Sequence, residues 1–349
     1  MSIESFIRHE AATLGFAAVG FVAVGPAQSF DRFQEWLDRG YAGEMYYLVR
    51  HAPLRSHPAQ LAPYARTVIV VAARYPAVTQ SACWSNYALG RDYHEVLRAR
   101  LKQLEQAIRG QSSSPLLARI CVDTAPLLER EWACRAGLGW IGRQGSLVHP
   151  EYGCCLFLGE LLVNLELEPS PPVPSQCGDC RLCVEACPTG AIQPDGFLDA
   201  RRCIACLTIE HQGAIPESMR PLIGTSLFGC DRCTVVCPWS RKGIGLPAPR
   251  MSGKLLPYGT KEENPPLTPP GRGTEVKLPS WEGPGVGSFQ GEVGIMSELA
   301  GAALPLPSPS DCLAMSESDF DRRFSGTVVQ RLGLSRLQRN AVIVMENAI

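Results

Sequence analysis

The sequence lacks the features that mark membrane-spanning, secreted and strongly basic proteins. No uninterrupted apolar run reaches the roughly 18–20 residues that a membrane-spanning helix needs. The first residues, MSIESFIRHEAATLGF, are amphipathic and have no positive segment followed by an apolar one, so we expect no secretion signal. The formal net charge is only −1, which excludes a basic footprint over the whole protein. A nucleic-acid partner would therefore have to bind a local patch.

Cysteine, in contrast, is abundant. The chain has 15 cysteines among 349 residues. Because the cytosol disfavours disulfides, we interpret these cysteines as metal ligands and expect a cytoplasmic protein. With 45% apolar and 19% charged residues, the chain has the composition of a globular protein, and its length is sufficient for two domains.

Helical and strand-like patterns alternate between residues 1 and 167. The segment TVIVVAARY (67–75) is a continuous β-branched run of the kind that is buried on both faces of a sheet. Apolar residues recur at helical spacing in HEVLRARLKQLEQAIRG, which ends at Gly110. The other expected strands are 15–24, 119–124 and 155–163, and the other expected helices are 3–14, 29–40 and 125–137. The pattern predicts an α/β domain over residues 1–167.

The remainder of the chain divides by composition. A proline-rich hinge, 168–175, leads into residues 176–240, which have nine cysteines, eight of them at ligand spacing, and predict a small fold held by its metal. Residues 241–310 contain 12 Pro and 12 Gly, a share above the roughly 25–30% that is typical of disorder. We therefore expect a disordered insertion over 241–311, followed by a short helical tail over 312–349.

Two cysteine runs have the spacing of iron–sulfur ligands. CGDCRLCVEACPTG (177–190) contains C-x2-C-x2-C-x3-C-P, and GCDRCTVVCPW (229–239) contains C-x2-C-x3-C-P. Four thiolates hold one 4Fe–4S cluster, and in two-cluster ferredoxins the fourth cysteine of such a run binds the other cluster. We therefore predict two 4Fe–4S clusters. The ligands of the first are expected to be Cys177, Cys180, Cys183 and Cys237, and those of the second Cys187, Cys203, Cys230 and Cys233.

The alternative for these cysteines is a pair of structural zinc sites. Zinc sites usually combine C-x2-C pairs that are separated by a dozen or more residues, which this spacing does not match. A brown protein would support clusters, and a colourless protein loaded with zinc would exclude them. The other cysteines have no ligand spacing, and we expect most to be buried as small apolar side chains. They are Cys83, Cys121, Cys134, Cys154, Cys155, Cys206 and Cys312.

An acid follows one of the predicted strands. The segment VDTAPLLERE places Asp123 where a buried strand meets a predicted helix, and ligands bind at the carboxyl ends of strands in open α/β sheets. Apolar surroundings would raise the pKa of this aspartate, so that it donates a proton near neutral pH. The alternative is a helix cap in which Asp123 or Thr124 accepts a backbone N–H. On the residues alone, the cap is the better supported of the two.

Three other segments contain candidate binding residues. Arg55 in HAPLRSHP suits a ligand clamp, although a solvated loop arginine is the default interpretation. NYALGRDYHE (86–95) contains Tyr93 and His94, and its alternative role is a helix N-terminus capped by Asp92. The glycines of GLGWIGRQGSL (137–147) fit G-x-G-x-x-G, but they follow a helical pattern where the dinucleotide fingerprint needs a strand.

The order of several longer motifs resembles the epoxyqueuosine reductase family. These motifs are VDTAPLLERE, AGLGWIGRQGSL, PEYGCCLFLGELL, CGDCRLCVEACPTGAI and the block from DARRCIACLTIE to GCDRCTVVCPW. The resemblance covers about residues 1–240 and resumes from about 312. It implies an oxidoreductase with an N-terminal α/β cobalamin domain joined to a ferredoxin-like domain with two 4Fe–4S clusters. Such an enzyme converts epoxyqueuosine to queuosine at the wobble position of tRNA. We also expect an external electron donor, no membrane association and a monomer.

The resemblance also implies roles for individual residues. The family's proton donor falls on Asp123, in the matching VDT motif. The residues expected to line the corrinoid are Arg55, Asp123 and Asp231, with Tyr93, His94 and Ser146 as weaker candidates. Cobalamin would carry the difficult step, the clusters would supply electrons, and a neutral Asp123 would supply a proton.

The chain departs from the family's pattern at three places. Arg143-Gln144-Gly145 follows GWIG where a Lys-Asn pair is common, and Cys206 stands where an aromatic residue is usual. The insertion begins just after Cys237, where it would either loosen the helices that shield the first cluster or help to hold tRNA. Two other functions therefore stay open. One is a corrinoid reductase of a small molecule such as a halogenated compound, and the other is an electron-transfer protein whose α/β domain has lost its cofactor.

Overall fold

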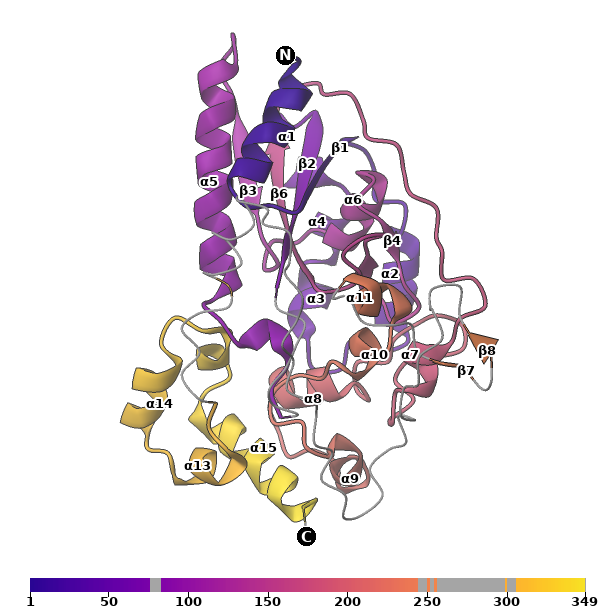
Figure 1. The fold of residues 1–349 in the computed structure, drawn as a ribbon, viewed down its shortest axis with the longest axis vertical. Helices are drawn as coiled ribbons and strands as arrows, with labels where there is room; N and C mark the ends of the chain where they lie inside the picture. Colours follow the sequence, from indigo (N-terminus) through magenta and orange to yellow (C-terminus); the bar gives the residue numbers. More distant parts are fainter. Residues whose placement is uncertain (76–82, 244–249, 252–253, 256–298, 300–305, 349) are drawn as a thin grey trace.

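The computed structural model describes residues 1–75, 83–243, 250–251, 254–255, 299 and 306–348 (Figure 1). Within these ranges the chain forms a four-stranded sheet with helices on both faces, a cysteine-rich segment of short helices, and a helical tail. No described helix is both long and apolar enough to cross a membrane. The mixed α/β fold that the sequence predicts is confirmed.

The sheet is antiparallel between all neighbouring strands. In spatial order it consists of β1 (Ala18–Ala23), β2 (Thr67–Arg74), β6 (Leu156–Val163) and β3 (Ala118–Cys121). β2 and β3 lie on either side of β6 and both run antiparallel to it, so they point the same way. Their carboxyl ends therefore meet the beginning of β6 at one end of the sheet. This end positions the candidate active site.

Helices cover both faces of the sheet, which explains the continuous apolar character of β2. On one face, α1 (Ile3–Thr13) and α5 (Tyr93–Gln111) bury a stripe that includes Leu101 and Leu104. On the other face, α6 (Glu129–Arg135) buries Trp132 and Ala133. Every residue from Thr67 to Ala73 is buried, because alternate side chains face the two cores. Figure 1 shows α1 and α5 side by side against the sheet.

The turn between β3 and α6 differs from the prediction. A helix was expected over 125–137, but α6 begins at Glu129, and the residues between Cys121 and Glu129 form a turn. Asp123 is therefore not a helix cap. The expected helix over 29–40 is observed as α2 (Phe30–Asp38), with Gly40 in a left-handed conformation just after it.

Short elements connect the sheet to the rest of the domain. They are α3 (Tyr46–Arg50), α4 (Ala52–Arg55), η1 (Pro58–Gln60), η2 (Asn86–Ala88), β4 (Trp140–Ile141) and β5 (Leu147–Val148). β4 and β5 pair as an antiparallel hairpin, so the glycine-rich segment 137–147 does not join a strand to a helix. A side chain at Gly139 would come within 2.1 Å of the Val148 carbonyl oxygen, so this glycine allows the close approach within the hairpin.

The cysteine-rich segment consists of short helices separated by turns. They are α7 (Leu182–Glu185), α8 (Ile204–Ile209), η3 (Glu217–Met219), α9 (Arg220–Ile223), α10 (Arg232–Val235) and α11 (Pro238–Gly243). Its small apolar clusters include the cysteines themselves, as in the group of Cys183, Ile192 and Val236. A segment with so little apolar core is of the kind that a bound metal stabilises.

The tail is helical and packs against both preceding parts of the chain. It consists of α13 (Pro309–Ala314), α14 (Glu317–Phe324), η4 (Val328–Arg331) and α15 (Leu334–Glu346). Ser308 and Ser316 each begin a helix with a capping box. Phe320 and Phe324 share one apolar core with Trp84 and Phe228.

Most of the insertion expected over 241–311 lies outside the described residues. The described part includes β7 (Arg250–Met251) and β8 (Lys254–Leu255), which pair as antiparallel two-residue strands. These strands were not expected from the sequence.

Candidate active site and cluster-binding segment

A cavity lies at the end of the sheet where β2 and β3 finish and β6 begins. Its volume is about 190 Å³ and it is partly open to solvent. Drug-sized ligands occupy roughly 300–1,000 Å³, so the cavity fits a small molecule or one edge of a larger one. The lining residues are Tyr75, Tyr87, Tyr93, Asp123, Glu129, Arg130, Ser146, Leu147, Cys154, Leu156, Phe157 and Leu158. Three of the predicted site residues, Asp123, Tyr93 and Ser146, are among them.

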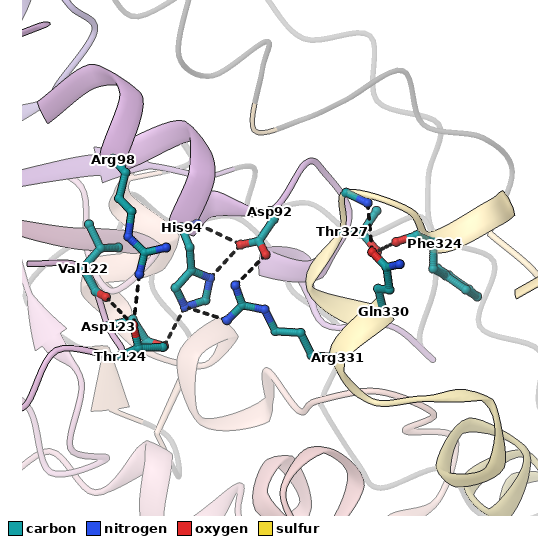
Figure 2. Close-up of polar contacts among 11 residues, drawn as sticks. Asp92, His94, Arg98, Val122, Asp123, Thr124, Phe324, Thr327, Gln330 and Arg331 are labelled. Carbon is teal, nitrogen blue, oxygen red and sulfur yellow. Dashed lines mark hydrogen bonds and ion pairs between the residues drawn. The ribbon is translucent and has the colours of Figure 1, made fainter. Parts of the chain in front are cut away.

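Asp123 has a backbone conformation that is costly for its residue type. Its φ is +48°, and no other non-glycine residue in the described ranges has a positive φ. Such a conformation costs about 1–3 kcal/mol and persists only where the surroundings impose it, often at functional sites. The Asp123 amide donates a hydrogen bond of 3.1 Å to Oε1 of Glu129, which helps to hold the turn. The strained turn directs the carboxylate toward His94 (Figure 2).

Asp123 belongs to a chain of hydrogen-bonded charged groups. His94 contacts Asp123 through Nε2, 2.8 Å from Oδ2, and Asp92 through Nδ1, 2.6 Å from Oδ1. Arg331 of the tail donates from Nη2 to Oδ2 of Asp92 at 2.8 Å (Figure 2). Asp92 also caps α5, as the alternative for this segment proposed, by accepting the His94 amide at 2.9 Å. Sequence reasoning did not connect these four side chains.

The expected rise in the pKa of Asp123 is wrong. Burial alone raises the pKa of Asp123, but hydrogen bonds from His94 and Tyr93 and the charge of His94 outweigh burial and lower it. For His94, burial lowers the pKa, whereas the hydrogen bonds to Asp123 and Asp92 outweigh burial and raise it. Both shifts favour the ion pair of an imidazolium and a carboxylate over the pair of a neutral imidazole and a neutral acid.

Two glutamates that the sequence analysis did not single out lie behind Asp123. Burial, and next the charge of Asp123, raise the pKa of Glu129 to about 7. Glu160 on β6 is 1% exposed, and its Oε1 has no hydrogen-bond partner among the described residues. Burial, followed by the charges of Glu129 and Asp123, raises the pKa of Glu160 well above its ordinary value. A lone acid within the apolar strand LFLGELLV was the available signal for Glu160.

Three predicted corrinoid contacts, Arg55, Asp231 and His94, lie outside the cavity lining. Arg55 ends α4 and is buried, so its interpretation as a solvated loop arginine is wrong. Its Nη1 donates to the His51 carbonyl at 3.2 Å, and burial lowers its pKa. Asp231 accepts hydrogen bonds from Ser85 Oγ at 2.5 Å and from the Asn86 amide at 2.7 Å. Its carboxylate thus ties the cysteine-rich segment to η2.

The thiols of the first predicted ligand set influence one another electrostatically, although no group of three or more His, Cys, Asp or Glu side chains in the described ranges is arranged to hold a single metal ion. After burial, the largest influences that raise the pKa of Cys183, to about 11, are the charges of Cys180, Cys237 and Cys177. The pKa of Cys180 is raised by burial and then by Cys237 and Cys177. The four thiols are therefore close enough to interact, although Cys237 is far from the others in sequence.

The thiols of the second predicted set also influence one another electrostatically. Burial raises the pKa of Cys233, and the charges of Cys230 and Cys203 add to it. Burial likewise raises the pKa of Cys203, with a further contribution from Cys187. Cys183 also influences Cys233, so the two sets are neighbours.

Cys154 connects the cavity to the first cysteine set. It lines the cavity, and its thiol is hydrogen-bonded with Cys237. Gln144 donates from Nε2 to the Cys154 sulfur at 3.0 Å, and Trp140 donates from Nε1 to the Cys177 sulfur at 3.4 Å. Cys154 is buried, as expected, but it also has this polar role.

The residues at which the chain departs from the family's pattern lie in the same region. Arg143 donates from Nη2 to the Gly178 carbonyl at 2.7 Å, which attaches the β4–β5 hairpin to the first cysteine run. Gln144 is buried against Cys154. Burial, and next the charge of Cys203, raise the pKa of Cys206 to about 12. All three side chains thus lie close to the predicted cluster ligands.

Comparisons with known proteins agree with this architecture. Residues 55–124 match the family model described as epoxyqueuosine reductase QueG, DUF1730, and residues 176–240 match a 4Fe-4S double cluster binding domain. The epoxyqueuosine reductase of Escherichia coli is 46% identical over 238 residues, which are 65% of this chain and 62% of that protein. The epoxyqueuosine reductase of Alicycliphilus denitrificans is 40% identical over 251 residues, which are 67% of this chain and 69% of that protein.

Solved structures give the same relationship over nearly the whole chain. The structure of epoxyqueuosine reductase from Streptococcus thermophilus has a TM-score of 0.76 and 26% identity, and the match covers 99% of this chain and 82% of that one. An epoxyqueuosine reductase crystallised with an epoxyqueuosine-modified tRNA-Tyr stem loop has a TM-score of 0.75 and 27% identity, with 99% and 81% covered. In the sequence match, this chain spans 62% of the length of the Escherichia coli relative. The motifs, the fold and these similarities together show that the chain belongs to the epoxyqueuosine reductase family.

Proposed function

We propose that the chain reduces epoxyqueuosine to queuosine in tRNA, using cobalamin and two 4Fe–4S clusters. One observation carries this proposal: a single cavity has Asp123 in one wall and Cys154, hydrogen-bonded with Cys237, in another. A proton-handling group and the cysteines that would hold an electron-carrying cluster therefore meet at one place.

The reaction determines what the cavity must supply. Removing an epoxide oxygen as water leaves a carbon–carbon double bond and consumes two electrons and two protons. Cobalamin, when bound, supplies a reduced metal centre that can pass electrons to the epoxide carbon. The clusters would deliver the electrons one at a time, and Asp123 would pass a proton to the departing oxygen.

The donor set fits two clusters. Each predicted set contains four thiols, and thiolate sulfur is the ligand that iron–sulfur clusters prefer. We assign Cys177, Cys180, Cys183 and Cys237 to one cluster, and Cys187, Cys203, Cys230 and Cys233 to the other. The first cluster would lie next to the cavity, because Cys237 contacts Cys154.

The cavity fits one edge of a corrinoid. Its walls combine aromatic rings with polar groups, which is typical of cofactor sites. Tyr93, which stacks on Phe157 at 4.2 Å, and Ser146 are the predicted contacts that line it. Arg55 and Asp231 would act from behind the lining. His94 is not free to ligate a metal, because both of its ring nitrogens contact carboxylates.

The tRNA substrate is supported by a relative and by the surface beside the cavity. The solved relative holds an epoxyqueuosine-modified tRNA stem loop. In this chain, α3 exposes Tyr46, Tyr47 and Val49, and the charge of Asp123 contributes to raising the pKa of Tyr47, after burial and Glu210. Exposed tyrosines near a reaction cavity can stack on unpaired bases of an anticodon loop. A cytoplasmic monomer that receives electrons from an external donor fits such a substrate.

The small volume of the cavity favours a second candidate, a corrinoid reductase of a small molecule. The two functions differ in their salt dependence. A tRNA enzyme makes phosphate contacts and loses affinity steeply as salt rises, whereas turnover of a small neutral substrate does not change in this way.

Nucleoside analysis of tRNA tests the proposal directly. A strain without its own epoxyqueuosine reductase accumulates epoxyqueuosine, and this chain should restore queuosine. Asp123→Asn should fail to restore it while retaining both clusters, and Asp38→Asn, at an exposed position on α2, should behave as wild type. Failure of the wild-type chain rejects the function, and full activity of Asp123→Asn rejects the proton-delivery role.

A further inference from the structure

The chain of charged groups at Asp123 joins two separate cavities. The reaction cavity includes Asp123, and a second open cavity includes Asp92 and Arg331. His94 lies between them, is 3% exposed, and contacts both aspartates. Figure 2 shows the ordered series from Arg331 through Asp92 and His94 to Asp123. The second cavity is lined by Asp92, Glu95, Ser325, Gly326, Thr327, Gln330 and Arg331.

Helix capping does not account for this arrangement. A cap needs one carboxylate oxygen and one backbone N–H, and Asp92 Oδ1 already accepts the His94 amide. The imidazole and the guanidinium are additional partners, and Arg331 comes from the tail, 239 residues after Asp92. Burying ionised groups costs free energy that a cap alone does not recover. The network is therefore better explained by a task in proton handling.

Arg331 contacts two members of the chain of charged groups, Asp92 and His94. Its Nη2 contacts Oδ2 of Asp92, and its Nη1 lies 3.2 Å from Nε2 of His94. While both ring nitrogens of His94 carry protons, the imidazolium and the guanidinium of Arg331 are both positive and repel each other. Once Nε2 has given its proton to Asp123, that nitrogen can accept a hydrogen bond from Arg331. Arg331 therefore favours the state in which the proton has moved toward Asp123.

We propose that His94 is the proton reservoir for Asp123, that Asp92 and Arg331 position it, and that the second cavity is the entrance through which solvent protons reload it. This inference rests on the proposed reductase function. In each transfer, the N–H bond at Nε2 breaks, an O–H bond forms on Asp123, and that proton then passes to the departing substrate oxygen. A solvent proton entering beside Arg331, whose side chain is 48% exposed, restores the Nε2–H.

The groups around His94 determine how it responds to pH. The aspartates at both nitrogens stabilise the imidazolium, and Arg331 opposes them. Tyr93 stacks on the ring at 4.1 Å. Other titratable and charged groups near the pair are Glu95, Arg98, Glu129, Arg130, Glu210, Tyr47 and Tyr87. Because the pKa of His94 is raised, it stays charged above the roughly 6.5 at which an ordinary histidine loses its proton.

Asp92→Asn tests the reservoir without removing the cap, because asparagine caps helices as well as aspartate does. The chain has six histidines, so ¹⁵N-histidine NMR of the holoprotein with oxidised clusters can follow each ring, with His94→Gln used for assignment. We expect the His94 resonance to titrate above 6.5 in the wild type and at lower pH in Asp92→Asn. A His94 that titrates at its ordinary value, or that does not respond to Asp92→Asn, overturns the inference.

Single-turnover rates on modified tRNA supply the catalytic measurement. His94→Gln should reduce the rate roughly 10²–10⁴-fold, the usual contribution of a general acid, with unchanged substrate affinity and cluster spectra. In Asp92→Asn the alkaline limb of the pH–rate profile should move to lower pH. In Arg331→Gln it should move to higher pH, with a lower maximal rate. Arg322→Gln removes an arginine–aspartate pair elsewhere in the same tail. This variant should change neither the maximal rate nor the position of the alkaline limb.

The outcomes separate the proton relay, meaning the transfer of a proton from His94 to Asp123, from the proposed function. A wild-type chain that never acts on tRNA rejects the function, while the NMR titration still decides whether His94 holds the proton. An active enzyme in which His94→Gln keeps the full rate rejects the relay alone. If His94→Gln loses its clusters, the pH–rate profile of Asp92→Asn is the deciding measurement. An alkaline limb that does not move in this variant rejects proton transfer from His94 to Asp123.

Discussion

The hydrogen bond from Trp140 to Cys177 predicts a change in the reduction potential of the first cluster. The indole Nε1 lies 3.4 Å from the Cys177 sulfur, and the ring is buried edge-on against Trp239, with centroids 5.1 Å apart. If Cys177 is a ligand, as we propose, this N–H stabilises the more negative, reduced cluster more than the oxidised one. Trp140→Phe should therefore lower the potential.

The size of this shift follows from hydrogen-bond energies. A hydrogen bond to a charged group contributes about 1.5–3 kcal/mol. Only the difference between the two oxidation states affects the potential, and we take it as about 1 kcal/mol. A tenfold change in an equilibrium constant corresponds to about 1.4 kcal/mol. The same change corresponds to about 59 mV for one electron. The expected shift is therefore about 40 mV toward more negative potential.

Potentiometric titration followed by electron paramagnetic resonance measures each cluster separately. Trp132→Phe is the matched control: the same indole N–H is removed from a buried tryptophan on α6, and this N–H has no hydrogen-bond partner within the described ranges. The control should leave both potentials unchanged, and Trp140→Phe should move only one of them. An unchanged or more positive potential in Trp140→Phe would refute the role of this hydrogen bond.

Two further predictions concern stability. The raised pKa of Glu160 means that the unfolded chain ionises this group before the folded one does, so the wild type loses stability as pH rises above about 4.5, by up to about 1.4 kcal/mol per pH unit. Glu160→Gln should therefore gain stability over the wild type between pH 5 and pH 7 in thermal or urea unfolding, and an equal difference at both pH values contradicts this. Leu101→Ala, in the fully buried stripe of α5, should cost about 2–5 kcal/mol in the same assay, with cluster spectra retained. A loss of less than about 1 kcal/mol in the free energy of unfolding would mean that the apolar stripe of α5 contributes little to the stability of the core.

The sheet and the long helices could be predicted because their patterns are local. The run TVIVVAARY and the leucines of α5 are periodic in sequence, and the structure contains both elements with nearly the expected bounds. The start of α6 was misplaced, because the turn at Asp123 depends on a left-handed conformation at a non-glycine residue. The contact between its amide and Glu129 belongs to the folded turn, and no composition rule identifies it.

The candidate site was only partly predictable for a similar reason. Cysteine spacing is local enough to suggest both ligand sets. In contrast, Asp123 meets a histidine 29 residues earlier and, through it, an arginine 237 residues after that histidine. Burial alone would raise the pKa of Asp123, but the fold also brings His94 against this carboxylate, so the expected direction is wrong. Strand position made Asp123 a candidate acid, and the family resemblance favoured it over a helix cap, but only the tertiary contacts show that it meets His94.

The tail contacts indicate that Arg331 keeps its position independently of the length of the insertion. Trp84 donates from Nε1 to the Pro307 carbonyl at 3.3 Å, and the Asp92 amide donates to the Gly326 carbonyl at 2.7 Å, so the N-terminal domain holds the tail on either side of α14. Asn340 on α15 donates to carbonyls of the cysteine-rich segment, at 2.9 Å to Thr208.

These contacts outweigh the entropy of a longer connection. Each doubling of loop length costs only about 0.6 kcal/mol, whereas burying a single phenylalanine contributes about 1.5–3 kcal/mol. The tail buries Phe320, Phe324 and Leu337 in the core that it shares with Trp84 and Phe228. Arg331 therefore stays beside His94 because the tail docks through its own contacts.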